Sequence, residues 1–374
     1  MTATTIVHVP LGARAYDVLV GRGLLARAGE LLAPVLDGPE AVVVTDSNLL
    51  ATDLPGRLGR GLEAGGIRYR TVVVPAGEAS KSMERLAALL DAILEGGADR
   101  RLAVVALGGG MIGDLAGLAA ALLLRGVPFV QVPTSLLAQV DSSVGGKTGV
   151  NSRFGKNLVG AFWQPRRVLV DVEALESLPR RELLAGYAEL VKHAFIKDAS
   201  LFAWLEAHAA ALLAGDPVLR AEAIARSVAI KAAVVAADER ETGGERALLN
   251  FGHTFAHAYE TLTGYGAELL HGEAVALGMA QAFALSTRLG RCPAEDAARA
   301  IEHLAAVGLP TRPERVRKGG FPVAEVLALM RRDKKATGGR LTFVLARGIG
   351  RAELARDVPE AEVAAFLADA GRAA

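Results

Sequence analysis

The sequence lacks the features of secreted, membrane-spanning and nucleic-acid-binding proteins. Its 374 residues include one cysteine, Cys292, which excludes an internal disulfide and fits a reducing compartment. The 42 basic residues nearly balance the 41 acidic ones, and a net charge of +1 argues against binding to nucleic acid or a membrane surface through charge. No run free of charged residues reaches the roughly 18 residues of a membrane-spanning helix, and we find no secretory signal. We therefore expect a soluble, cytoplasmic protein.

Lysine is scarce as well. Only nine of the 42 basic residues are lysines, so arginine fills most positions that need a surface cation. A lysine that persists against this bias is a candidate for a role that needs a compact, mobile charge with three donors. The lysines are Lys81, Lys147, Lys156, Lys192, Lys197, Lys231, Lys318, Lys334 and Lys335.

The sequence does contain enough apolar material for large cores. Hydrophobic residues make up 51% of the chain, and 374 residues correspond to roughly two domains of ~150 residues. Apolar runs alternate with helical patterns over residues 1–177, which predicts an α/β domain with a mostly parallel sheet. Residues 178–374 are predicted to form a helical domain, in which only 341–345 resembles a strand. The predicted strands of the first domain are 41–45, 71–74, 102–107, 127–132 and 168–172, and the predicted helices of the second are 180–197, 199–213, 218–237, 246–262, 272–289, 294–307 and 323–332.

A glycine-rich motif follows the third predicted strand. Residues 108–114 read GGGMIGD and open a predicted helix. Glycines let the backbone approach a pyrophosphate, and a helix N-terminus offers free N–H groups. The motif does not follow the first strand, and no acidic residue between Asp114 and Asp141 is available to hold a ribose, as a standard Rossmann unit requires. The pattern favours a nucleotide site of another type over a structural glycine turn.

Residues 139–157 are rich in glycine, serine and asparagine and contain two of the rare lysines, Lys147 and Lys156. We predict a loop of about 19 residues, and loops of this length in a compact domain are usually functional. Lysines among backbone donors favour an anion site. A mobile surface loop is the alternative.

The predicted helical domain carries the sharpest pattern. Arg246, Asn250, His253 and His257 are spaced by four, three and four residues, which predicts one continuous polar face on a helix that begins near Arg246. Such a donor-rich stripe along an apolar helix is typical of a helix that lines a polar cleft.

Two further positions belong to the same helical domain. Glu189 and Lys192 share a face of the helix 183–196, and His271 begins the next helix after 246–262. The sequence has no H-E-x-x-H motif, and Glu189, His253 and His271 are too far apart to be grouped as metal ligands by spacing.

Taken together, the motifs resemble those of the 3-dehydroquinate synthase family of sugar-phosphate cyclases. The resemblance implies an NAD-binding α/β domain, a helical domain that holds one divalent metal ion, zinc or cobalt, and a homodimer. It implies conversion of 3-deoxy-D-arabino-heptulosonate 7-phosphate to 3-dehydroquinate and phosphate, within the shikimate pathway. The motifs are PAGEASK (75–81), LGGGMIGD (107–114), RGVPFVQVPTSLLAQVDSSVGGKTGVN (125–151), GKNLVGAFWQP (155–165), DERE (238–241), LLNFGHTFAHAYE (248–260) and LLHGEAVALGM (269–279), with the Glu189–Lys192 helix.

The resemblance also implies roles for individual residues. The implied metal ligands are Glu189, His253 and His271. The implied NAD contacts are Asp46, Gly77, Glu78, Lys81, Gly110, Met111, Ile112, Gly113, Asp114, Thr134, Ser135, Lys147, Lys156, Ala174, Leu175, Glu176 and Ser177. The implied substrate contacts are Arg125 (toward the partner subunit's site), Asp141, Lys147, Asn157, Lys192, Lys231, Arg246, Asn250, His257 and Lys334, of which Lys147, Lys192, Asn250 and His257 are the expected catalytic residues.

The sequence departs from the family pattern only at small or conservative positions. Ala256 replaces a usual glycine, Ser135 and Ser177 stand where threonine is common, and Trp163 stands where tyrosine is common.

Three alternative functions stay open. A sibling cyclase of the valiolone or amino-dehydroquinate type would share the NAD and metal sites. We expect Lys231 and Arg246 to form a carboxylate clamp, which favours an acidic substrate. A metal-dependent polyol dehydrogenase and a non-catalytic nucleotide-binding module are the other two.

Overall fold

The computed structural model describes residues 4–333 and 340–370. The chain forms two compact units, one of residues 1–179 with 215–240 and one of residues 180–214 with 241–374. The chain therefore passes between the units three times, and a single boundary at residue 178 marks only the first passage. Lys334 lies outside the described residues. None of the helices in the described part combines the length and apolarity that crossing a membrane requires.

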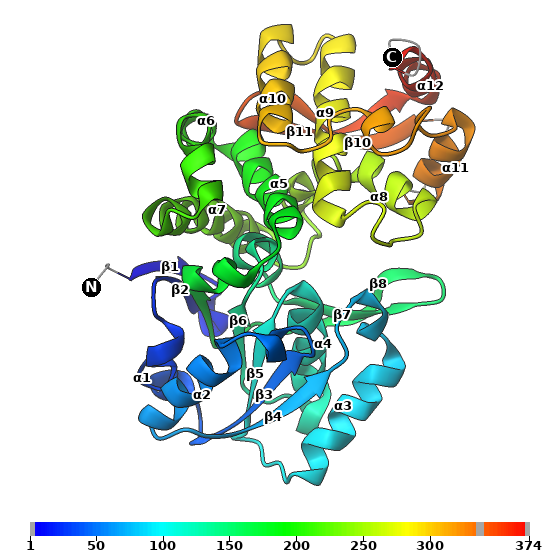
Figure 1. Cartoon of the computed structure of the whole chain (residues 1–374). Helices are drawn as coiled ribbons and strands as arrows, with labels where there is room; N and C mark the ends of the chain where they lie inside the picture. The colour runs from blue at the N-terminus through cyan, green and yellow to red at the C-terminus, as the bar shows by residue number, and fades with distance from the viewer. Residues whose placement is uncertain (1–3, 334–339, 371–374) are drawn as a thin grey trace. The chain divides into compact units, whose positions relative to one another are not determined.

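The first unit contains a seven-stranded sheet in the order β1-β2-β9-β6-β5-β3-β4 (Figure 1). The β1–β2 pair is antiparallel, and every other pairing in the sheet is parallel. The sequence patterns revealed five of these strands but missed β1 and β2. The strands are β1 (Thr5–Val9), β2 (Tyr16–Gly21), β3 (Glu40–Asp46), β4 (Arg68–Val74), β5 (Ala103–Gly108), β6 (Phe129–Pro133) and β9 (Arg167–Asp171).

Apolar cores lie on both faces of this sheet. Successive side chains of β3 alternate between them: Val42 and Val44 pack with α3 and α4, whereas Ala41 and Val43 pack with α1 and α2. A strand buried on both faces has no polar side to alternate, which explains the continuous apolar runs in the sequence. The helices are α1 (Ala28–Leu32), α2 (Leu54–Ala64), α3 (Met83–Glu95), α4 (Gly110–Leu122) and α7 (Pro217–Ala237).

Helix α7 belongs to the first unit although the chain reaches it only after two helices of the second unit. It packs against β1 and β2. Its start is well defined, because the Asp216 carboxylate accepts hydrogen bonds from the N–H groups of Val218 and Leu219 and Pro217 occupies the first turn.

The segment predicted as a loop over residues 139–157 contains regular structure instead. A π-helical turn (Ala138–Ser142) is followed by an antiparallel hairpin of β7 (Lys147–Ser152) and β8 (Gly155–Phe162). Gly149 and Gly160 face each other, and a Cβ at Gly160 would lie 2.1 Å from the carbonyl oxygen of Thr148. The glycines that lowered the strand propensity are thus the residues that let the two strands approach.

The second unit is mainly helical, as predicted, and the predicted fold class is confirmed. It also contains an antiparallel hairpin of β10 and β11, of which the sequence patterns revealed only the first strand. The single cysteine, Cys292, is buried in this unit. Its elements are α5 (Arg180–Lys197), α6 (Ala199–Ala214), α8 (His253–Leu262), α9 (His271–Arg288), α10 (Ala294–Ala306), α11 (Val323–Asp333), β10 (Arg340–Gly348), β11 (Arg351–Pro359) and α12 (Glu360–Ala370).

The prediction of one helix over residues 246–262 is wrong. A 3-10 turn, η9 (Arg246–Asn250), ends at Phe251, and α8 begins at His253. Between them Gly252 adopts a left-handed conformation with φ +80°. A Cβ at Gly252 would lie 2.6 Å from the backbone nitrogen of Met279 on α9. The close approach of α9 therefore requires glycine here, and the break separates Arg246 and Asn250 from the two histidines of α8.

Candidate functional site

Three helices of the second unit bring one carboxylate and two imidazoles together. Glu189 lies in the middle of α5, His253 is the first residue of α8 and His271 is the first residue of α9. The Nε2 atoms of His253 and His271 lie 3.7 and 3.3 Å from Oε1 of Glu189. One ligand atom from each residue lies within 4.8 Å of the other two. The fold thus assembles three groups that the sequence spacing could not group.

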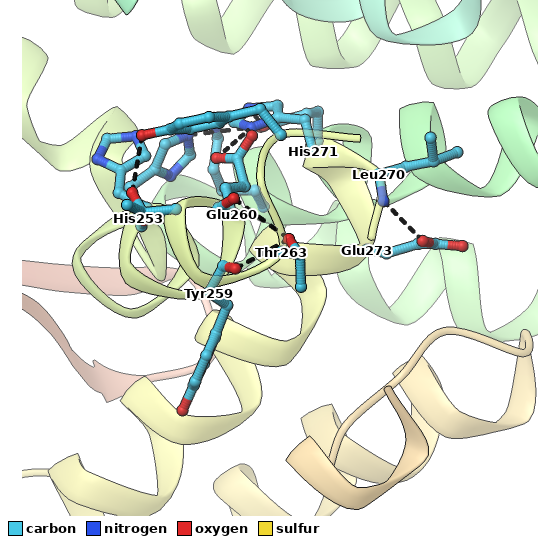
Figure 2. A network of polar contacts seen from close by, with 12 residues as sticks. His253, Tyr259, Glu260, Thr263, Leu270, His271 and Glu273 are labelled. Atoms are coloured by element: carbon cyan, nitrogen blue, oxygen red, sulfur yellow. Dashed lines mark hydrogen bonds and ion pairs between the residues drawn. The ribbon is translucent and has the colours of Figure 1, made fainter. Parts of the chain in front are cut away.

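The Nδ1 atoms of both imidazoles are engaged on the side away from Glu189. Nδ1 of His253 donates to the carbonyl oxygen of Phe251 at 3.2 Å, and Nδ1 of His271 lies 3.1 Å from Oε2 of Glu260 (Figure 2). A proton held on Nδ1 leaves the Nε2 lone pair available for a metal ion. Two nitrogen donors and one oxygen donor form the ligand set of an open, catalytic zinc site. The chemistry and orientation of these side chains fit a divalent metal ion.

The electrostatics of the cluster differ between the two histidines. Burial, followed by the charge of Lys192, lowers the pKa of His253 to about 3, so its imidazole is neutral. Burial also lowers the pKa of His271, but hydrogen bonds and charges from Glu189 and Glu260 outweigh it and raise this pKa to about 10. Without an ion, a proton is thus strongly favoured on His271 between the two carboxylates. This is also the place where a metal ion would be most favoured.

Lys192 follows Glu189 on the same face of α5, as its spacing predicts. Its ammonium group forms an ion pair with Oε2 of Glu189, and both side chains are 1% exposed. Removing either side chain would leave the other as an uncompensated buried charge, which would destabilise the fold.

The loop before α9 is held by an arginine from α5. Arg181 forms a two-point contact with the carboxylate of Glu273, at 2.6 and 2.7 Å, and also donates to the carbonyl oxygens of Ala267 and Glu268. Glu273 in turn accepts the backbone N–H of Leu270 at 2.8 Å, which caps the helix that His271 begins (Figure 2). These contacts fix the start of α9 relative to α5. Sequence reasoning missed both Arg181 and Glu273.

The remaining residues predicted for the second unit lie on the same segments. The ring of His257 is 5.5 Å from that of His253, one turn along α8. Arg246 is buried in η9, and Nδ2 of Asn250 lies 3.4 Å from Oε1 of Glu241.

In the first unit, most of the residues implied for NAD lie along one edge of the sheet; Lys147 and Lys156, on the separate β7–β8 hairpin, are the exceptions. The others follow the carboxyl ends of five consecutive strands, β9, β6, β5, β3 and β4. In an open parallel sheet this edge is where ligands bind. Asp46 ends β3, Gly77 follows β4 with φ +102°, and Thr134 follows β6. Ala174 and Leu175, after β9, bury their side chains and can offer only backbone groups, whereas Glu176 and Ser177 are exposed.

The glycine motif forms the turn from β5 into α4. A Cβ at Gly108 would lie 2.6 Å from Cβ of Ile112, and one at Gly113 would lie 2.6 Å from Oε1 of Gln131 on β6. These glycines allow the tight turn and the close packing of α4 on the sheet, which leaves the helix N-terminus at Gly110 facing the carboxyl edge. The arrangement fits a phosphate group of a dinucleotide.

A polar network connects this edge to the β7–β8 hairpin. The ammonium group of Lys81 donates to Asp114 at 2.5 Å and to Oδ1 of Asn157. Burial raises the pKa of Asp114, and the charge of Lys81 opposes this. Asn157 adopts a positive φ of 56° and donates its backbone N–H to Oδ1 of Asn151 at 3.0 Å. The structure therefore brings two implied NAD residues together with one implied substrate residue.

Asn151 is a further residue of this network that sequence reasoning did not single out. Its Nδ2 donates to Oε1 of Glu78 at 2.7 Å, and its backbone N–H donates to the carbonyl oxygen of Lys81 at 2.8 Å. It thus contacts the segment after β4 and Asn157 at once. An asparagine in a hairpin carries no signal that would have revealed this in the sequence.

The other residues predicted for the first unit lie on α7, the hairpin and nearby segments. The ammonium group of Lys231 on α7 contacts both the carboxylate and the carbonyl oxygen of Asp141. Arg125 is exposed and has a positive φ of 69°. Lys147 and Lys156 lie on the two strands of the hairpin, and Ser135 accepts the backbone N–H of Ala138. Lys231 belongs to the first unit and Arg246 to the second, so neither unit alone contains the predicted carboxylate clamp.

Solved sugar-phosphate cyclases share this architecture. The chain is 31% identical to 2-epi-5-epi-valiolone synthase of Streptomyces hygroscopicus subsp. jinggangensis, with a TM-score of 0.85 over 96% of this chain and 97% of that one; that structure holds NAD⁺ and Zn²⁺. It is 25% identical to 2-deoxy-scyllo-inosose synthase in complex with carbaglucose-6-phosphate, NAD⁺ and Co²⁺, with a TM-score of 0.84 over 98% and 99% of the two chains. The fold is that of the sugar-phosphate cyclases.

Sequence comparison identifies the family within this class. Residues 71–185 match the family model of the 3-dehydroquinate synthase N-terminal region, and residues 186–336 match that of the C-terminal region. The 3-dehydroquinate synthase of Rhodospirillum rubrum is 56% identical over 97% of this chain and 94% of its own length, and that of Ruegeria pomeroyi is 53% identical over 97% and 98%. The chain belongs to the 3-dehydroquinate synthase family, which confirms the resemblance inferred from its motifs.

Proposed function

We propose that the protein converts 3-deoxy-D-arabino-heptulosonate 7-phosphate to 3-dehydroquinate and phosphate, as a 3-dehydroquinate synthase. The observation that carries the proposal is the assembly of Glu189, His253 and His271 in a chain 56% identical to a 3-dehydroquinate synthase over nearly its whole length. The reaction oxidises a substrate hydroxyl, eliminates phosphate, returns the hydride, opens the ring and closes a carbocycle by an aldol step. No net oxidation occurs, so NAD is recycled.

Two groups would be held by residues of this chain. Glu189, His253 and His271 hold a divalent zinc or cobalt ion, and the carboxyl edge of the sheet with the Gly110 helix start holds NAD. When bound, the metal ion supplies Lewis acidity toward substrate oxygens and NAD supplies a reversible hydride acceptor. The ligand atoms available to the ion and the glycine turn described above support this assignment.

The chain's own cations suit a substrate with a phosphate and a carboxylate. Lys147, Lys192, Lys231 and Arg246 are the proposed anion-binding residues, and several point charges with multiple donors hold such groups best. Lys231 is already oriented by Asp141, so its ammonium group does not have to be immobilised on binding. Asn157 and Asn250 are proposed to donate to substrate oxygens.

His257 is the proposed proton-transfer group. It lies next to His253 on α8, and a single imidazole can both accept and donate a proton at a fixed position. The eliminated phosphate is the other group that could remove the proton, and a His257→Gln variant separates the two. A fall of about 10²-fold or more in turnover with unchanged metal content would support a role for His257.

We propose that the protein is a homodimer in which Arg125 reaches the partner subunit's site. The exposed conformation of Arg125, with its positive φ, and several exposed apolar side chains on the neighbouring segments support this.

Inactive Arg125→Ala and Lys192→Ala chains, mixed under subunit exchange, should recover some activity through one intact site. Sizing as a monomer, or no recovery after verified exchange, would contradict a shared site. The exposed apolar side chains are Leu122, Phe154, Leu158, Val159 and Phe162.

A direct assay tests the reaction. The purified protein with NAD, zinc and the heptulosonate phosphate should release phosphate without net accumulation of reduced NAD. Stoichiometric reduced NAD would indicate a polyol dehydrogenase instead.

The valiolone-type cyclase is the second candidate, because the fold is similar to that of 2-epi-5-epi-valiolone synthase. Turnover of sedoheptulose 7-phosphate as fast as the acid would favour this function. Lys231→Met should lower turnover of the acid at least tens-fold, since removing a charged hydrogen bond to a buried anion costs ~2–5 kcal/mol. Lys197→Met is the matched control, because Lys197 pairs with Glu245 and has no proposed role in the site.

A further inference from the structure

Glu260 is a buried carboxylate in an unfavourable position. It is 3% exposed and lies in the last turns of α8, which ends at Leu262. Burial disfavours a carboxylate, and so does the negative end of a helix dipole. The carbonyl oxygen of Glu260 accepts the backbone N–H of Tyr265 and the hydroxyl of Thr263, so the end of the helix is completed without the carboxylate (Figure 2). The carboxylate needs another explanation.

The geometry supplies one, because this carboxylate faces His271. Oε2 of Glu260 lies 3.1 Å from Nδ1 of His271, on the side of the ring opposite to the Nε2 atom that faces Glu189. The corresponding Nδ1 of His253 is held by a backbone carbonyl, which carries no net charge. The two imidazoles of the cluster are thus oriented in the same way by partners of different charge.

From this asymmetry we infer that Glu260 is a positioning residue for the metal ion. This inference rests on the metal site of the proposed function. An ionised carboxylate can only accept a hydrogen bond, so Glu260 fixes the proton of His271 on Nδ1 and leaves Nε2 as the metal-binding atom. The carboxylate also increases the electron density that Nε2 donates. Glu260 itself does not touch the ion or the substrate.

The charge balance of the cluster agrees with this role. Glu189 and Glu260 carry two negative charges and Lys192 one positive charge, all on buried side chains. A metal ion on Nε2 replaces the extra proton of His271, and with both imidazoles neutral these side chains carry a net negative charge that a divalent cation compensates. Glu260 therefore contributes to metal affinity through both tautomer and charge.

The test measures metal binding directly. Zinc affinity of the full-length protein is determined by competition with a chelator, for wild type, Glu260→Gln and Glu260→Ala. We expect the zinc Kd to rise at least ten-fold in Glu260→Gln, because the amide can donate as well as accept and has lost the charge, and to rise further in Glu260→Ala. Glu260→Asp keeps the charge and should retain more of the affinity than Glu260→Ala. The visible spectrum of the cobalt-substituted protein should change in Glu260→Ala, because the ligand geometry relaxes.

Two control variants distinguish a failure of the inference about Glu260 from a failure of the metal site itself. Glu206→Gln removes a surface carboxylate paired with Arg299 and should leave the zinc Kd unchanged. His271→Ala removes a proposed ligand; if zinc binding survives it, the metal site itself is wrong.

If His271→Ala abolishes binding while both Glu260→Gln and Glu260→Ala bind zinc like the wild type, the site stands and the inference about Glu260 is overturned. A merely structural Glu260 would lower the melting temperature equally with zinc and with chelator. A positioning residue reduces the increase in melting temperature that zinc produces.

Discussion

The candidate site of the first unit is formed largely by backbone groups, whereas that of the second unit is formed by side chains. In the first unit, most of the proposed NAD contacts follow five consecutive strands, and many of them are glycines or residues with buried side chains that offer backbone groups. In the second, the proposed metal ligands are three side chains from three helices, each oriented by further buried groups. A backbone site depends on the sheet and its turns, whereas a side-chain site depends on individual functional groups. Single substitutions should therefore act selectively in the second unit and more diffusely in the first.

The largest selective effect is expected at Glu189. Glu189→Gln removes the charged ligand atom but keeps the shape of the side chain. Loss of the metal ion removes several kcal/mol of transition-state stabilisation, so turnover should fall by about 10³-fold. The NAD Kd should stay within about two-fold of wild type, measured by fluorescence titration. A parallel loss of NAD binding would show that the two sites are not independent.

The glycines of the two units offer the next contrast. A Cβ at Gly272 on α9 would lie 1.9 Å from the carbonyl oxygen of Ala185 on α5, whereas one at Gly113 meets only the end of the Gln131 side chain at 2.6 Å. A backbone oxygen cannot rotate away, but a glutamine can. We expect Gly272→Ala to lower the free energy of unfolding by about 3 kcal/mol and Gly113→Ala by about 1 kcal/mol or less, in denaturant titrations of the chelated protein. Equal losses would contradict the distinction.

Asn151 tests whether the first unit also contains a selective side chain. Asn151→Ala removes the hydrogen bonds to Glu78 and to the backbone of Asn157. Each is worth about 1 kcal/mol, so the NAD Kd and the substrate KM should each rise up to about ten-fold, while metal content stays constant. Ser152→Ala is the matched control, since the hydroxyl of Ser152 forms hydrogen bonds with Phe154 and Gly155 in the turn of the same hairpin. A change in kcat alone would argue against a positioning role in binding.

The smallest expected effect is a dependence of stability on pH in the second unit. Burial lowers the pKa of His303, whose Nε2 lies 2.8 Å from the hydroxyl of Tyr187. A histidine with a lowered folded-state pKa contributes stability above its unfolded-state pKa of about 6.5, and this is lost as pH falls toward the folded-state value. The wild type should therefore lose more unfolding free energy than His303→Asn between neutral and mildly acidic pH. Measuring both in chelator keeps the metal site equal in the comparison, and identical slopes would contradict the prediction.

Local patterns in the sequence revealed most of the helices because each helix repeats its apolar face every few residues. The bounds predicted for 180–197 and 294–307 agree with α5 and α10 to within one residue. The missed elements depend on partners distant in the chain. Strands β1 and β2 complete the sheet by pairing, and β11 is a strand because it pairs with β10. A short segment does not carry this information by itself.

The candidate metal cluster illustrates the same limit. Its members were named through family resemblance, whereas their grouping depends on how α5, α8 and α9 pack. Gly252 interrupts the predicted helix at the point where α9 passes, and this packing cannot be read from an i, i+4 pattern. The groups that orient the ring of His271 come from other helices: Glu260 from α8, and Arg181 from α5, which acts through Glu273. Such contacts have no spacing signature.

The buried position of Cys292 makes the protein suitable for site-specific labelling. Burial raises the pKa of this thiol to about 11, so little of the reactive thiolate is present at neutral pH. Maleimide dyes should not react with Cys292 but should react with cysteines introduced at exposed positions such as Ala88 on α3 and Ala298 on α10. One such cysteine in each unit would allow fluorescence energy transfer to follow the distance between the units while NAD and substrate are added, with the native cysteine left in place.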